Sequence, residues 1–156
     1  MEKADFDYDY DQFRGELNKV TYAYKRIKDK LMQNFEHWKE LGPKFLSDQL
    51  SVEVGKDGES VAGVVVGKRF SISLTPLAIE NDNYALAVLT TVNLVSKLPV
   101  EIDRFLVSIN GDVLSMEREM LLDWDNEYQS LKLLVAVARR VIRADSVPVQ
   151  SRLPAP

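Results

Sequence analysis

Alternating acidic residues near the N-terminus are the first group in the sequence that could bind a ligand. Four aspartates occupy every second position there, namely Asp5, Asp7, Asp9 and Asp11. This spacing matches the first carboxylates of a calcium-binding loop, which also needs a glycine at its sixth position and a glutamate at its twelfth. The chain has Gln12 at the sixth position and no glutamate at the twelfth, so we expect no calcium site. The run is either an acidic-aromatic arm or the N-terminal cap of a helix.

Groups that could carry catalysis are scarce. His37 is the single histidine, and its helical context predicts a surface residue. The absence of cysteine excludes a disulfide scaffold, a thiolate zinc site and a cysteine nucleophile. The acidic cluster 123–127 lacks the spacing of an EF-hand and is more typical of a helix cap, and no glycine-rich run precedes a helix. We therefore predict no catalytic residue, no metal site and no cofactor.

A long amphipathic helix is predicted from Asp9 to Gly42. Its large apolar residues recur at steps of three and four, on one stripe: Phe13, Leu17, Val20, Tyr24, Ile27, Leu31, Trp38 and Leu41. Asn34 occupies the one position of the stripe that lacks an apolar residue. At about 1.5 Å per residue the helix is roughly 43 Å long, as long as the whole domain. Either it crosses a full sheet face or its first part projects.

The ends of this helix carry recognisable signals. Asp9 followed by Gln12 has the form of a capping box, and Gly42 before Pro43 fits a left-handed C-terminal cap. Packing on a sheet is favoured over a coiled coil, because the residues flanking the stripe offer no complementary charges. Tyr22 lies opposite the stripe and is therefore a candidate contact for a partner.

Three strands with alternating apolar residues are predicted between Leu50 and Leu74. Hairpin turns are expected at Asp57-Gly58 and at Gly67-Lys68. These turns align Val54 with Val61, Val52 with Gly63 and Leu50 with Val65, and then Val65 with Phe70, Gly63 with Ile72 and Val61 with Leu74. Both turns send the large apolar residues to one face, which predicts a three-stranded meander.

The second half of the chain predicts a central strand, a further hairpin and a helix. Tyr84 to Val95 is apolar on both faces and rich in β-branched residues, which favours a buried strand over a helix. Asn110-Gly111 is a strong hairpin signal. Its predicted pairs are Ile109 with Asp112, Val107 with Leu114, Phe105 with Met116, Arg104 with Glu117 and Asp103 with Arg118. Apolar residues at helical spacing from Tyr128 to Ile142 predict a last helix, with Asp125 or Asn126 as its N-cap.

These elements predict one α+β domain, an antiparallel meander of about five to six strands packed against a long N-terminal helix and a C-terminal helix. It spans residues 9–146, after a flexible acidic arm of residues 1–8 and before a disordered tail of residues 147–156. The net charge of −4 makes nucleic acid an unexpected partner. No apolar run is long enough to span a membrane, and the acidic N-terminus does not resemble a signal peptide, so we expect a cytoplasmic protein or one delivered without a classical signal.

Function is predicted only by elimination. The layout is similar to that of small bacterial partner proteins, including secretion chaperones, toxin-immunity proteins and phage or plasmid inhibitors, and no motif selects among them. We expect a non-enzymatic module that binds another protein, and a homodimer is plausible. The candidate partner-binding residues are Phe6, Tyr8, Tyr10, Tyr22 and Arg26. The alternative is a small-ligand or carboxylate-based enzymatic domain with a cleft between the sheet and a helix, with or without a divalent cation.

Overall fold

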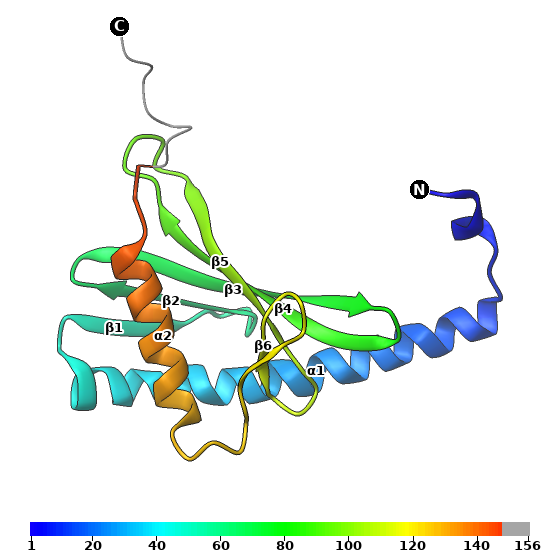
Figure 1. Cartoon of the computed structure of the whole chain (residues 1–156), viewed down its shortest axis with the longest axis horizontal. Coiled ribbons are helices and arrows are strands. Elements are labelled where there is room, and N and C mark those ends of the chain that lie inside the picture. The colour runs from blue at the N-terminus through cyan, green and yellow to red at the C-terminus, as the bar shows by residue number, and fades with distance from the viewer. Residues whose placement is uncertain (148–156) are drawn as a thin grey trace, which may run out of the picture.

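The computed structural model describes residues 1–147 as an antiparallel sheet with two α-helices (Figure 1). The elements in order are the 3-10 helix η1 (Lys3–Phe6), α1 (Tyr10–Leu41), the π-helical turn η2 (Gly42–Leu46), β1 (Leu50–Val54), β2 (Ser60–Val65), β3 (Lys68–Ile79), β4 (Asp82–Val92), β5 (Pro99–Val107), β6 (Val113–Leu114), β7 (Met120–Leu122) and α2 (Gln129–Arg143). Every strand pairs with its neighbours in sequence. The predicted α+β meander is confirmed, with seven strands in the described chain rather than five to six.

α1 begins and ends close to its predicted residues, but its end has a different conformation. Asp9 is the N-cap, as predicted. Gly42 has φ −56° and stays in the right-handed helical region, so the predicted left-handed cap is wrong, and the chain continues through Pro43 into η2. A glycine fits here because the strand packs closely: an added Cβ would lie 3.2 Å from the Leu50 carbonyl oxygen.

The first three strands form the predicted meander, with one change of register. Val54 lies opposite Val61, as predicted. The β2–β3 pairing differs by two residues, because its turn is Val66-Gly67, with φ values of 49° and 78°. Since side chains alternate between faces, a shift of two keeps each residue on its predicted face. The predicted core residues that are buried here are Leu50, Val61, Val65, Phe70, Ile72 and Leu74.

β4 confirms the predicted central strand, which ends at Val92 rather than at Val95; Leu94 and Val95 lie in the turn that follows and are exposed. It pairs with β3 and β5, and both of its faces bury apolar side chains. Ala85, Ala87 and Leu89 face the main core beneath the helices. On the opposite face, Tyr84 packs with residues of β5 and β6 in a second, smaller cluster.

The hairpin at Asn110-Gly111 is shifted by one residue from the prediction. Val107 lies opposite Val113. The loop has one residue more than the predicted two-residue turn, because Ser108 rather than Ile109 pairs with Asp112, and Gly111 takes φ 89° in it. A one-residue shift exchanges the faces, so Leu114 joins the second cluster while Phe105 stays in the main core. The predicted cross-strand ion pairs are therefore wrong. The ion pairs that form instead are Arg104 with Glu101, Asp103 with Arg140 and Arg118 with Glu80.

α2 crosses the same face of the sheet that α1 covers (Figure 1), and side chains of both helices belong to one core. It begins at Gln129 with Tyr128 as its N-cap, so the predicted caps Asp125 and Asn126 are wrong. Asn126 instead closes the turn before the helix, where its carbonyl oxygen accepts a hydrogen bond from the Gln129 N–H at 3.0 Å.

Two side chains of α1 hold the start of α2. The Trp38 Nε1–H donates to the Ser130 carbonyl oxygen, and the Asn34 amide donates to the Gln129 side-chain oxygen, both at 2.9 Å. These bonds link residues more than ninety positions apart. They fix the crossing of the two helices.

The chain ends test the domain boundaries only in part. Residues 1–8, predicted to be a flexible arm, contain η1, and their flexibility stays a prediction. The predicted tail 147–156 lies outside the described residues, apart from Val147.

Candidate protein-binding surface

The first turns of α1 reach past the tip of the β3–β4 hairpin, at one end of the protein (Figure 1). The β1–β2 turn lies beside Tyr24 and Lys28 of α1. There the Lys28 ammonium lies 3.8 Å from the Glu59 carboxylate, and the half-buried Tyr24 packs against the main core. N-terminal to Tyr24, the apolar side of the helix loses the cover of the turn.

An exposed apolar stripe follows on this part of the helix. We call Tyr10, Phe13 and Leu17 the free stripe; their exposed fractions are 71%, 50% and 48%. Further along the helix, on the same line of steps of four and seven, lie Leu31 and Phe35, which are 1% and 0% exposed. The same helical face is thus buried at one end and open to solvent at the other.

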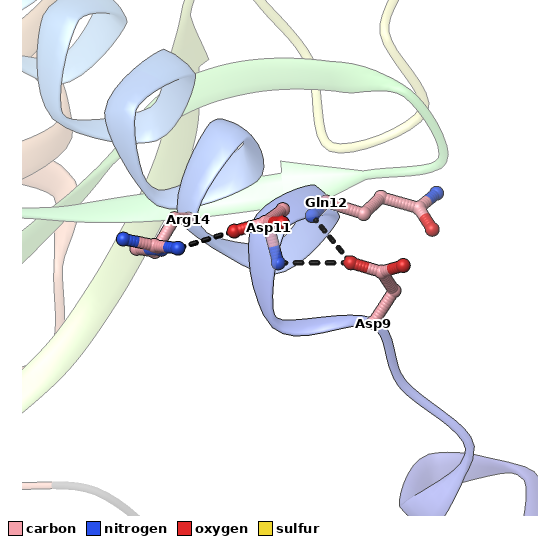
Figure 2. Close-up of polar contacts among 4 residues, drawn as sticks. All are labelled: Asp9, Asp11, Gln12 and Arg14. Atoms are coloured by element: carbon pink, nitrogen blue, oxygen red, sulfur yellow. Dashed lines mark hydrogen bonds and ion pairs between the residues drawn. The ribbon is translucent and has the colours of Figure 1, made fainter.

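The first turn of α1 is stabilised by its own polar groups. Figure 2 shows one oxygen of the Asp9 carboxylate accepting hydrogen bonds from the backbone N–H groups of Asp11 and Gln12, at 2.9 and 3.1 Å. Asp11 also forms an ion pair with Arg14. A cap of this kind contributes about 1 kcal/mol and satisfies helix N–H groups that would otherwise lack partners. The projecting helix is therefore well defined up to its first residue.

A different face of the same helical segment borders the tip of the β3–β4 hairpin. The groove between them has a volume of about 470 Å³ and is lined by Gln12, Gly15, Glu16, Lys19, Val20, Ala78, Glu80, Asn81 and Asn83. The groove is mainly polar in residue type, and the free stripe lies on the adjacent face of the helix. The hairpin therefore does not cover the free stripe.

The predicted partner-binding residues form two separate groups. All five are exposed: Phe6, Tyr8, Tyr10, Tyr22 and Arg26. Tyr8 and Tyr10 meet edge to face, with ring centroids 4.9 Å apart and hydroxyl oxygens 3.1 Å apart, and this hydrogen bond raises the pKa of Tyr8. Tyr22 and Arg26 lie on another face of α1, one helical turn apart, and the Arg26 guanidinium donates to the Tyr22 hydroxyl at 3.0 Å.

Sequence reasoning missed Phe13 and Leu17, which it assigned to the core. Their periodicity is that of buried residues, and nothing in the pattern marks where the sheet stops covering the helix. The one available signal was the length of the helix, which allows its first part to project.

A cleft of the kind that the alternative function would need lies between the sheet and α2. It has a volume of about 640 Å³, and its lining includes the apolar residues Leu89, Phe105 and Val137. The lining has two carboxylates, Asp103 and Glu117, and Asp103 forms an ion pair with Arg140, with Oδ2 3.2 Å from Nε. Within residues 1–147, no three acidic or histidine side chains come together as a metal site would require.

Comparison with protein-family models, with curated proteins and with solved structures finds no match for this chain. None of the helices in residues 1–147 is long and apolar enough to cross a membrane. The surface of the protein therefore carries the evidence for its function.

Tyr24 provides a titration test of the boundary between the covered and free parts of α1. Its hydroxyl is buried and makes no hydrogen bond of good geometry within residues 1–147. Burial, followed by the nearby Glu59 and Asp57 carboxylates, raises the pKa of Tyr24 to about 12 from 10.0. Because the folded state holds this proton more tightly, it loses stability as the pH rises from 10 towards 12.

We expect the tyrosinate absorbance of the folded protein to contain a step near pH 12. Tyr24→Phe should remove that step, and the exposed-site control Tyr22→Phe should leave it in place. A folded Tyr24→Phe variant that keeps the late step would show that the step belongs to another tyrosine and would contradict the raised pKa of Tyr24.

Proposed function

We propose that this protein is a non-enzymatic binding module that attaches to another protein through the free stripe and the acidic arm. Inhibitors, immunity proteins and chaperone-like partner proteins act in this way, by occupying a surface of their target. The observation that supports the proposal is the change from burial to exposure along one helical face, from Leu31 and Phe35 to Phe13 and Leu17. Contiguous apolar side chains on a capped, projecting helix are typical of a surface that a partner covers.

The spacing of the free stripe fits recognition of a helix in a groove or against another helix. Tyr10, Phe13 and Leu17 lie at positions i, i+3 and i+7, the pattern by which amphipathic helices insert anchors into an apolar partner. Full burial of a Leu or Phe side chain is worth roughly 1.5–3 kcal/mol, so the uncovered halves of two such residues offer about that much together. The neighbouring carboxylates of the arm would favour a partner with basic residues around its apolar contact.

A capture experiment with matched variants tests the proposal. Tagged wild-type protein is incubated with extract of its native host, and bound proteins are quantified by mass spectrometry. Leu17→Glu and Phe13→Glu should each reduce a specific captured protein at least about tenfold, because each places a charge in the apolar contact. Leu98→Glu, at a loop residue that is 64% exposed, should not reduce it.

The same variants decide whether the proposal fails. Circular dichroism must first show that they keep the wild-type helix content and melting temperature. Equal capture by wild type and folded Leu17→Glu would contradict the proposed surface.

A small-ligand role is the second candidate, and the cleft beneath α2 favours it. Its apolar lining and the exposed basic residues Lys132 and Arg140 fit an apolar molecule with an anionic group better than a metal-bound substrate. This role does not need the free stripe. Ligand-induced stabilisation that Leu17→Glu leaves unchanged, together with no specific capture, would favour it over protein binding.

A further inference from the structure

We infer that the partner on the free stripe is a second copy of this chain, with the two α1 helices antiparallel. This inference rests on the proposed function, because it requires the free stripe to be a protein-binding surface. The free stripe would then mediate self-association about a two-fold axis. The charge distribution along the N-terminal segment and the extent of the uncovered helix support this pairing.

The charge on this segment changes sign along its length. Residues 1–12 carry five acidic side chains and one lysine. Further along α1, residues 19–28 carry four basic side chains and no acidic one. Lys19 lines the groove beside the β3–β4 hairpin, Arg26 bonds to Tyr22 on another face, and Lys28 pairs with Glu59, so Lys25 is the basic side chain that we expect a second copy to meet. Asp7 and Lys25 make no ion pair within residues 1–147. The chain thus carries both halves of a complementary charge pattern.

This pattern selects the orientation of a second copy. An antiparallel pair places the acidic arm of each copy beside the basic segment of the other, so both ends of the contact are attractive. A parallel pair would place the five carboxylates of residues 1–12 beside the same five of the other copy and repel them. Antiparallel pairing of identical chains is also isologous, so it closes at two copies and builds no fibre.

The uncovered length of the helix sets the register. The free stripe begins at Tyr10, and the half-buried Val20 is the last residue on this side before the β1–β2 turn covers Tyr24. The midpoint of residues 10–20 is residue 15. Antiparallel pairing about that midpoint sets Phe13 opposite Leu17 of the partner subunit. The acidic arm precedes α1, so it lies at the end of the contact where Lys25 of the partner subunit stands. The apolar contact and the charge contact are then satisfied by one arrangement.

The first measurement is the mass of the purified full chain by sedimentation equilibrium, from low micromolar to submillimolar concentration. We expect a monomer–dimer equilibrium that salt weakens several-fold, because exposed charges contribute to it. Leu17→Glu should weaken association at least about a hundredfold, since both copies lose a buried leucine at once. Leu98→Glu is the matched control and should leave the dissociation constant unchanged.

Charge reversal tests the orientation. Lys25→Glu alone should weaken association, because each arm would then meet a carboxylate, and Asp5→Lys combined with Asp7→Lys should weaken it similarly. An equimolar mixture of these two variants should regain the wild-type affinity as a heterodimer, since both of its ends are complementary again. In a parallel dimer, Lys25→Glu would exchange one like-charge contact for another and leave the affinity unchanged.

Each remaining outcome bears on the inference. A monomer at all concentrations overturns it, and so does a dimer whose affinity Leu17→Glu does not change. The proposed function is judged separately by the capture experiment. A monomer whose host partner is still lost in Leu17→Glu would refute the self-association and support the binding surface.

Discussion

Trp38→Ala is expected to lower the free energy of unfolding by about 3–5 kcal/mol, the usual cost of removing a buried tryptophan. Trp38 is 0% exposed, and its ring lies against Phe35 with centroids 4.9 Å apart. Its indole N–H also donates to the Ser130 carbonyl oxygen at 2.9 Å. The substitution therefore opens a cavity between α1, α2 and the sheet and removes one of the bonds that hold α2.

Denaturant unfolding followed by circular dichroism measures this effect. Trp38→Phe keeps most of the packing and loses the indole donor, so its cost should lie clearly below that of Trp38→Ala. The other tryptophan, Trp124, is only half buried, and Trp124→Ala serves as a control with a smaller cost. A cost for Trp38→Ala no larger than that of Trp124→Ala would contradict the packing of α2 on α1.

Most of the architecture could be predicted from the sequence, because periodicity reports which residues share a face. α1, β4 and α2 were all identified in this way, and the fold class followed from them. Registers were less predictable. Val66 takes φ 49°, which β-branched residues rarely adopt, so no propensity rule would place it in the second hairpin turn. At Asn110-Gly111 the loop has one residue more than the predicted turn. That extra residue places Leu114 on the face of the second cluster instead of the face of the main core.

The candidate surface was predictable only in part. The exposed aromatic residues of the arm were found because an acidic, alternating segment does not fit a core. Phe13 and Leu17 were not found, because their spacing is the same as that of the buried Ile27 and Leu31. Only the three-dimensional extent of the sheet decides which of these residues stay exposed.

The polar contact of Asn34 with Gln129 lies beyond any local pattern. Asn34 interrupted the predicted apolar stripe, and the sequence did not show what it meets. Its partner is 95 positions away, and the two side chains are 6% and 5% exposed. The sequence shows that Asn34 is polar within an apolar stripe, and the fold shows that its partner is Gln129 at the start of α2.

Removing one member of this pair should cost far more than removing both. The Asn34 amide donates to the Gln129 oxygen at 2.9 Å, while the Gln129 amide nitrogen is buried without a hydrogen-bond partner within residues 1–147. Asn34→Leu leaves all of the Gln129 side chain unpaired, and we expect a loss of about 1–3 kcal/mol in the free energy of unfolding. Gln129→Met leaves the buried Asn34 amide without its acceptor, and the loss in the free energy of unfolding should be similar.

The double variant Asn34→Leu with Gln129→Met replaces both polar groups by apolar groups of similar shape. Neither side chain then needs a hydrogen bond, and a buried nitrogen that is unpaired in the native protein is removed, so stability should return to within about 1 kcal/mol of wild type. Chemical unfolding of all four proteins gives the coupling energy as a double-mutant cycle. Additive losses in the double variant would contradict this account, because they would mean that each amide stabilises the fold through a group other than its partner.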